Sequence, residues 1–193
     1  RKISSKLPVS LYTNIIFKNT YGIDNVIYDK DIDKRLICKA KALLKSPYEK
    51  TIFLDTDILI YRRIIVDIFK VLDEFEFTCC HGNAPPHKGG IYPDLNTGLL
   101  GVNNNDFTRE QINKWIKAYV SCNDQLSFRE VVFMNNKNKF YILPPYFMMR
   151  SYHYIDYPGH AVLIHDHDIS KPEPKKKVIS KIIETWNKKY LNT

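Results

Sequence analysis

The stretch Thr51-Ile52-Phe53-Leu54, followed directly by Asp55-Thr56-Asp57, constrains the fold of this chain more than any other feature. A short apolar run of this kind is typical of a strand buried on both faces of a sheet. In open α/β sheets, ligands bind in the crevice outside the carboxyl ends of the strands. Two carboxylates at that end repel each other unless a cation or hydrogen-bond donors offset their charge. The motif therefore indicates a site for Mg²⁺ or Mn²⁺, although an isolated Asp-x-Asp is also common in ordinary turns.

Strands alternate with helices along the rest of the chain. Apolar patterns predict further strands at residues 7–13, 26–27, 75–80, 99–102, 140–143 and 161–164. Helical spacing predicts helices over residues 31–45 (capped by Asp31 or Asp33), 64–72, 106–120, from about 124, and 175–190. Residues 81–94 carry glycine, proline and histidine without periodicity, which predicts a long loop. The alternation predicts one α/β domain over residues 1–193, with a mostly parallel mixed sheet flanked by helices.

Composition and charge narrow the function classes. No apolar run approaches the roughly 20 residues of a membrane span, and no signal-peptide pattern opens the chain. The four cysteines show no CxxC spacing, which favours reduced thiols and a cytoplasmic location; Cys79 and Cys80 should point to opposite faces of their strand. The net charge of +8 suits a polyanion such as nucleic acid, anionic lipid or a nucleotide diphosphate. Scattered basic residues and the absence of a known nucleic-acid motif disfavour nucleic acid.

Three further motifs carry groups suited to a binding site. Asn96-Thr97-Gly98 precedes an apolar strand, and its glycine allows a ligand to approach the backbone closely. Asn123-Asp124-Gln125 offers side chains for sugar hydroxyls, although Asp124 is equally suited to cap a helix. His165-Asp166-His167-Asp168 follows an apolar run, and imidazole suits Mn²⁺ or Zn²⁺ better than Mg²⁺. Each of these motifs also occurs in ordinary turns.

Taken in this order, the motifs resemble those of the GT-A glycosyltransferases, in particular the glycogenin-like family 8 enzymes. The pattern in that family is a lysine on a helix, an apolar strand ending in Asp-x-Asp, and Asn-(Ser/Thr)-Gly before a strand. Asp-Gln then opens a helix, and a late strand ends in His, with Lys-Pro beyond. The matching residues are Lys39, Asp55, Asp57, Asn96 to Gly98, Asp124, Gln125, His165, Lys171 and Pro172.

The resemblance implies a site for Mn²⁺ (or Mg²⁺) and a UDP-sugar donor of the UDP-glucose or UDP-galactose type. The implied metal ligands are Asp55, Asp57 and His165. Gln125 would lie near the anomeric carbon and Asp124 beside it, which makes these two the implied catalytic residues. The implied donor contacts are Lys39, Asp55, Thr56, Asn96, Thr97, Gly98, Asp124 and Lys171. The acceptor would be a glycan or a glycoprotein, and transfer of the hexose would retain the anomeric configuration.

The sequence departs from the family pattern in two places. The family's first strand, which carries residues for the nucleotide base, has no counterpart, because residues 1–3 match the helix that follows it. The chain is therefore interpreted as a possible fragment of a longer protein. The glycine before Lys-Pro is also absent, and His167 competes with His165 as a metal ligand.

Other functions remain open at this point. In an inverting transfer, Asp124 would act as a general base near the acceptor. A metal-dependent hydrolase or nuclease also uses paired carboxylates and histidines, including a zinc site built from His81, His87, His165 and His167. A non-catalytic module that binds a sugar nucleotide or nucleic acid is a further alternative.

Overall fold

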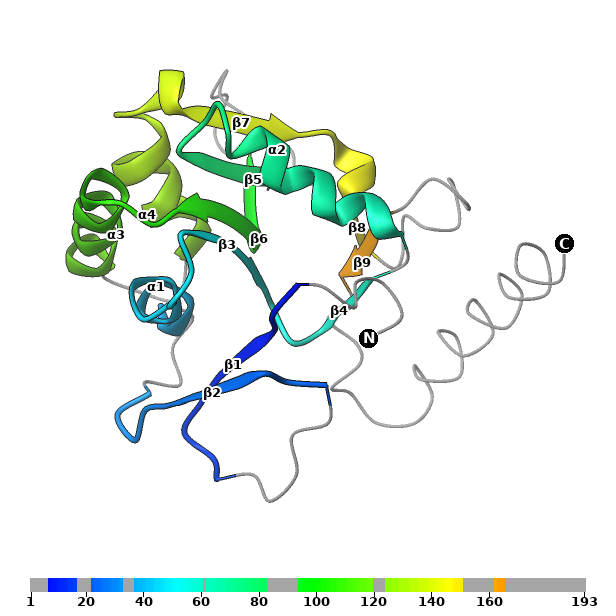
Figure 1. Ribbon diagram of the computed structural model, residues 1–193. Helices are drawn as coiled ribbons and strands as arrows, with labels where there is room; N and C mark the ends of the chain where they lie inside the picture. Colours follow the sequence, from blue (N-terminus) through cyan, green and yellow to red (C-terminus); the bar gives the residue numbers. More distant parts are fainter. Residues whose placement is uncertain are drawn as a thin grey trace, which may run out of the picture.

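The computed structural model describes residues 7–16, 22–32, 37–60, 62–82, 94–119, 124–150 and 162–165 of the chain. The strands of this described part form a four-stranded, a three-stranded and a two-stranded sheet (Figure 1). The predicted helix at residues 175–190, Lys171 and His167 lie outside the described residues, as does most of the predicted loop at residues 81–94. No helix within the described ranges is long and apolar enough to cross a membrane.

The central sheet has the strand order β3-β6-β5-β7. These strands are β3 (Lys50–Leu54), β6 (Leu95–Asn103), β5 (Phe77–His81) and β7 (Phe140–Leu143). β6 is antiparallel to β3 and to β5, and only β5 and β7 are parallel. The predicted α/β fold with a mixed sheet is confirmed, but the parallel share is smaller than predicted. An apolar strand buried on both faces has the same sequence pattern whichever way it runs, so the pattern does not reveal its direction.

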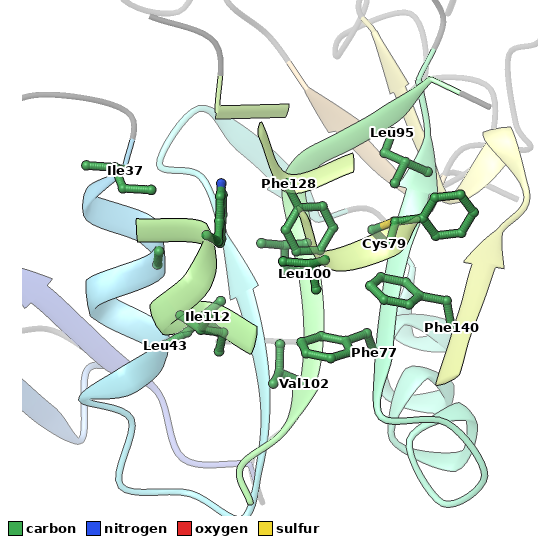
Figure 2. Close-up of a cluster of buried hydrophobic side chains, with 14 residues drawn as sticks. Ile37, Leu43, Phe77, Cys79, Leu95, Leu100, Val102, Ile112, Phe128 and Phe140 are labelled. Carbon is green, nitrogen blue, oxygen red and sulfur yellow. The ribbon is translucent and has the colours of Figure 1, made fainter. Parts of the chain in front are cut away.

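Helices cover both faces of the central sheet. On one face lie α1 (Cys38–Leu44), α3 (Asp106–Ala118), α4 (Asp124–Phe128) and the π-helix η3 (Arg129–Phe133); Figure 1 shows α1, α3 and α4 grouped away from β8 and β9. Their buried side chains form one cluster with Phe77, Leu100 and Phe140 of the sheet (Figure 2). On the other face, the 3-10 helix η1 (Arg63–Asp67) and α2 (Ile68–Val71) form a second cluster.

The buried strand residues alternate between these two clusters. Cys79 belongs to the first cluster and Cys80 to the second, as predicted for neighbours on a strand. Both thiols are free, and burial raises the pKa of Cys79 to about 12. These cysteines are therefore packing residues of the core.

A three-stranded sheet adjoins the end of β3. It contains β4 (Ile58–Ile60), β9 (Leu163–His165) and β8 (Met148–Arg150), which follows the 3-10 helix η5 (Pro145–Phe147). β9 is antiparallel to β4 and parallel to β8, and its register sets His165 opposite Ile58. This pairing brings the late histidine beside the turn after β3.

β1 (Ser10–Thr13) and β2 (Asn25–Tyr28) form a separate parallel pair. The hydroxyl of Tyr48, in the connection between α1 and β3, lies 2.7 Å from Ser10 Oγ and 2.7 Å from Asn25 Nδ2 and holds this pair against that connection. Val26 and Tyr28 of β2 are exposed. β1 and β2 confirm the two strands predicted near the start of the chain.

Several element boundaries differ from the predictions. α1 begins at Cys38 with Ile37 at its N-cap, so Asp31 does not cap it; Asp33 lies outside the described residues. The helix predicted over residues 64–72 is a 3-10 helix followed by one α-helical turn. His81 ends β5, and a 3-10 helix, η4 (Lys137–Lys139), precedes β7. Helix ends depend on tertiary packing, which local propensity does not include.

Candidate active site

A tight turn at the end of β3 carries the two aspartates. The backbone N–H of Ile58 donates to the carbonyl of Asp55 at 3.2 Å, which closes a four-residue turn. The N–H of Asp55 donates to Gly98 O at 2.9 Å and fixes the start of the turn against β6. Thr56, a predicted donor contact, is exposed in the middle of the turn, whereas Asp55 and Asp57 are half-buried. The turn therefore directs both carboxylates to the same edge of the sheet.

His165 completes a group of three metal-competent side chains. Its Nε2 lies 3.1 Å from Asp57 Oδ1 and 4.0 Å from Asp55 Oδ2. One ligand atom from each of the three residues lies within 4.8 Å of the others. The imidazole is buried, and both carboxylates reach solvent. The structure thus brings together the three predicted metal ligands.

Gly98 makes room for this imidazole. A Cβ atom added at Gly98 would lie 2.8 Å from His165 Cε1 and 3.0 Å from its Nδ1, which is closer than side chains normally approach. The Gly98 N–H donates to Asn96 Oδ1 at 2.9 Å, so the buried Asn96 holds the backbone of the motif. Gly98 was predicted to let a ligand approach the backbone. In the structure, the space beside it is occupied by the imidazole of His165.

An irregularity in β6 positions this motif. Cys79 pairs with Leu100, but the next residue, Cys80, pairs with Asn96, so three residues of β6 are unpaired with β5. Bulges of this kind re-aim side chains beside functional sites. The motif was predicted to precede a strand at residues 99–102; that boundary is wrong, because β6 already begins at Leu95 and includes the motif. Leu95 and Asn96 pair with His81 and Cys80 of β5, and sequence alone does not indicate this register.

Lys39 connects the metal-competent group to Asp124. Its ammonium is buried, at 2.9 Å from Asp124 Oδ2 and 3.3 Å from Asp55 Oδ2. Thr97 Oγ1 lies 3.3 Å from the same ammonium and donates to Asp124 Oδ2 at 2.6 Å. Lys39 comes from α1, Thr97 from β6 and Asp124 from α4. Three elements far apart in the sequence therefore converge on one buried ion pair.

The site carries an excess of negative charge. Within the part of the chain that the structure describes, the Lys39 ammonium pairs with Asp55 and Asp124, and Asp57 lies beside His165. With His165 neutral, these residues carry a formal charge of −2. Burial raises the pKa of Asp55 above its ordinary value, and the nearby ammonium of Lys39 offsets part of that rise. A divalent cation would neutralise the remaining charge. Two carboxylates and one imidazole suit Mn²⁺ better than Mg²⁺, which prefers oxygen ligands throughout.

Two residues at the start of α4 behave differently. Asp124 is buried within the ion pair, whereas Gln125 is half-buried on the same helix. Sequence reasoning missed Trp115 of α3, whose Nε1 donates to the Asp124 carbonyl at 3.2 Å and to Ser127 Oγ at 3.1 Å. A buried indole N–H requires an acceptor. The position of Trp115 on the apolar face of a predicted helix could therefore have indicated that its N–H bonds to a neighbouring element.

The fold is that of the GT-A glycosyltransferases, as the sequence predicted. One similar solved structure is a glycosyltransferase involved in the glycosylation of the major capsid of PBCV-1, with a TM-score of 0.57, 16% identity, and coverage of 85% of each chain. Another is the galactosyltransferase LgtC in complex with donor and acceptor sugar analogs, with a TM-score of 0.56, 14% identity, and coverage of 85% of this chain and 75% of LgtC.

The glycosyltransferase GlyE of Streptococcus pneumoniae TIGR4 is similar at a TM-score of 0.53 and 17% identity. The match covers 86% of this chain but only 50% of GlyE. No protein-family model and no curated protein sequence matches the chain. The similarity therefore lies in the three-dimensional fold, which these proteins share at low sequence identity.

Proposed function

We propose that this protein is a metal-dependent glycosyltransferase that moves a hexose from a UDP-sugar to a glycan or glycoprotein acceptor. The observation that carries the proposal is the convergence of Asp55, Asp57 and His165 at the carboxyl end of β3, within a GT-A fold. The excess negative charge of the site fits a divalent cation such as Mn²⁺, held by these three side chains. The absence of a side chain at Gly98 leaves room for the imidazole of His165 in this group. When bound, such an ion offsets charge on the leaving diphosphate.

The neighbouring residues suit the sugar of the donor. Lys39, Thr97 and Asp124 form a hydrogen-bonded polar group directly beside Asp55. Asp124 would accept hydrogen bonds from sugar hydroxyls, and Gln125, one residue further along α4, would face the anomeric carbon. In the transfer, the bond from the anomeric carbon to the diphosphate breaks and its electron pair stays on the diphosphate. The acceptor oxygen forms the new bond, and its proton passes to the diphosphate, which leaves as UDP.

The environment of Asp124 favours retention over inversion. A general base must reach the acceptor hydroxyl to remove its proton. Asp124 Oδ2 is already engaged by Lys39 and Thr97, so this carboxylate is suited to holding the donor sugar rather than to proton transfer. In a retaining transfer no strong base is required, because the leaving phosphate takes the acceptor proton.

The free, buried Cys79 and Cys80 agree with a cytoplasmic location.

Calorimetry of UDP, UDP-glucose and UDP-galactose, with and without Mn²⁺, tests the proposal. We expect Mn²⁺-dependent binding by the full chain, and a loss of about 100-fold or more in Asp57→Asn, since a metal ligand is removed. Asp67→Asn is the matched control, because Asp67 at the end of η1 pairs with Lys70 of α2, outside the metal-competent group.

Mass spectrometry of the products gives the second part of the test. Transfer to an oligosaccharide mixture should release UDP and add a hexose to the acceptor. Binding of UDP that is independent of Mn²⁺, or equal in Asp57→Asn and the wild type, would contradict the proposed site. Release of the free hexose without transfer to any acceptor would instead indicate a hydrolase.

A further inference from the structure

The indole of Trp115 lies at the junction of α3 and α4. It is fully buried, and it packs edge-on against Phe128 with ring centroids 4.8 Å apart. It shares the inner face of α3 with Thr108, Gln111 and Ile112. An apolar ring of similar size could make these packing contacts. The nitrogen of the indole is the feature that such a ring would lack.

The Trp115 N–H is directed at the backbone of Asp124. Its two acceptors are the Asp124 carbonyl, at 3.2 Å, and Ser127 Oγ, at 3.1 Å. The Ser127 hydroxyl in turn donates to the same carbonyl at 3.0 Å. The indole and the hydroxyl therefore form a closed triangle with the carbonyl of the first residue of α4. A shared acceptor of this kind fixes the position of the Asp124 backbone relative to α3.

The side chain of the same residue reaches the candidate active site. Asp124 Oδ2 accepts from Thr97 Oγ1 at 2.6 Å and lies 2.9 Å from Lys39 Nζ. Only the short Asp side chain separates this carboxylate from the carbonyl that Trp115 holds. A displacement of the first turn of α4 would therefore change the distance from Asp124 to Lys39 directly.

We infer that Trp115 is a positioning residue, whose indole N–H fixes the Asp124 carboxylate against Lys39 and Thr97 for contact with the donor sugar. The inference about the sugar rests on the proposed function. The geometric part does not, because it concerns the protein without a ligand. Trp115 is distant from the metal-competent group in sequence and acts only through Asp124.

A double-mutant cycle tests the geometric part. Trp115→Phe removes the N–H, and Thr97→Val removes the hydroxyl that donates to Asp124 Oδ2. The two side chains bond to opposite ends of Asp124, so their effects should be coupled. We expect the double variant to melt about 2–4 °C higher than the sum of the two single shifts predicts. This difference corresponds to the free energy of one hydrogen bond in a domain of this length.

Ile112→Val is the matched control. Ile112 is buried in the same cluster and on the same face of α3, but its side chain carries no polar group. It should destabilise the protein to a similar degree as Trp115→Phe, and its melting shift should add to that of Thr97→Val. Additive shifts for Trp115→Phe as well would overturn the inference, because Trp115 would then act through packing alone.

Ligand binding tests the part that concerns the sugar. In Trp115→Phe, Mn²⁺-dependent affinity for UDP should stay within about twofold of the wild type. Affinity for the UDP-sugar that the wild type prefers should fall about fivefold, while Ile112→Val changes neither. Equal losses for UDP and the UDP-sugar would overturn this role. Absence of UDP binding in the wild type would contradict the proposed function alone, since the melting cycle is measured without ligand.

Discussion

The two ends of β6 both carry polar residues, but they meet different partners. At the carboxyl end, Asn103 and Asn104 direct their amides at backbone carbonyls. Asn105 forms a capping box with Thr108 at the start of α3. At the amino end, Thr97 and Gly98 lie against Lys39, Asp124 and His165.

The difference between these ends is one of charge balance. The neutral amides of Asn103 and Asn104 at the carboxyl end donate to neutral carbonyls, and each pairing supports the fold. At the amino end, the described residues bring three carboxylates together with one ammonium, which is a costly arrangement without a further cation. Half-buried amides that donate to backbone carbonyls therefore indicate structure, whereas an excess of charge at the end of a sheet indicates a ligand.

Among the substitutions considered, removal of Lys39 at the amino end should destabilise the protein most strongly. Lys39→Met leaves Asp124 buried without its counter-ion, which should cost about 3–5 kcal/mol of the free energy of unfolding. Lys50→Met is the control: Lys50 pairs with an exposed Asp73, and its loss should cost at most about 1 kcal/mol. Urea denaturation measures both. Equal costs would mean that the buried ion pair is not a distinct energetic unit.

Gly98→Ala should impair the amino end without affecting the carboxyl end. The added methyl group would displace His165 from Asp57, so affinity for Mn²⁺ should fall about 10–100-fold. Electron paramagnetic resonance of Mn²⁺ measures the bound fraction. Gly101→Ala, on the same strand, would instead meet Thr78 and Ile68, and should lower the melting temperature. Unchanged Mn²⁺ binding in Gly98→Ala would show that His165 is not a ligand.

Asn103→Ala should destabilise the carboxyl end of β6 and leave the amino end unaffected. It removes two hydrogen bonds, to Leu72 O at 2.7 Å and Phe75 O at 3.0 Å, and should cost about 1–2 kcal/mol of the free energy of unfolding. Binding of Mn²⁺ should be unchanged. Asn113→Ala on the exposed face of α3 serves as the control, with an effect within about 0.5 kcal/mol. A metal-binding defect in Asn103→Ala would contradict the separation of the two ends.

Asp29 extends the comparison to a carboxylate with complete partners, and its effect should be the smallest. Hydrogen bonds from Lys45 and Tyr12 lower the pKa of Asp29 to about 2. A lowered pKa stabilises the folded protein above the unfolded value near 3.8, and this stabilisation is lost as the pH falls toward 2. Asp29→Asn should therefore flatten the acid-induced decline in melting temperature between about pH 4 and pH 2. A decline as steep as in the wild type would contradict this assignment.

The sequence predicted the ingredients of the site better than their arrangement. The Asp-x-Asp motif after an apolar strand, and the start of α3 at Asp106, follow from local patterns. The bulge that separates Thr97 and Gly98 from β5 could not be predicted, because it depends on simultaneous pairing with two strands. The role of Trp115 was missed for a similar reason, since its acceptor lies on another helix.

By itself, the sequence determined the alternation of strands and helices, and the residue types that suit a divalent cation. Hydrophobic periodicity and turn chemistry act over a few residues, so they are readable locally. Only the tertiary structure decided that β6 runs antiparallel to its neighbours, that His165 pairs beside Asp57, and that Lys39 is committed to Asp124. These features depend on strand register and on ion pairs between segments that are far apart in the sequence. Such interactions contribute to stability only when the folded chain brings those segments into contact.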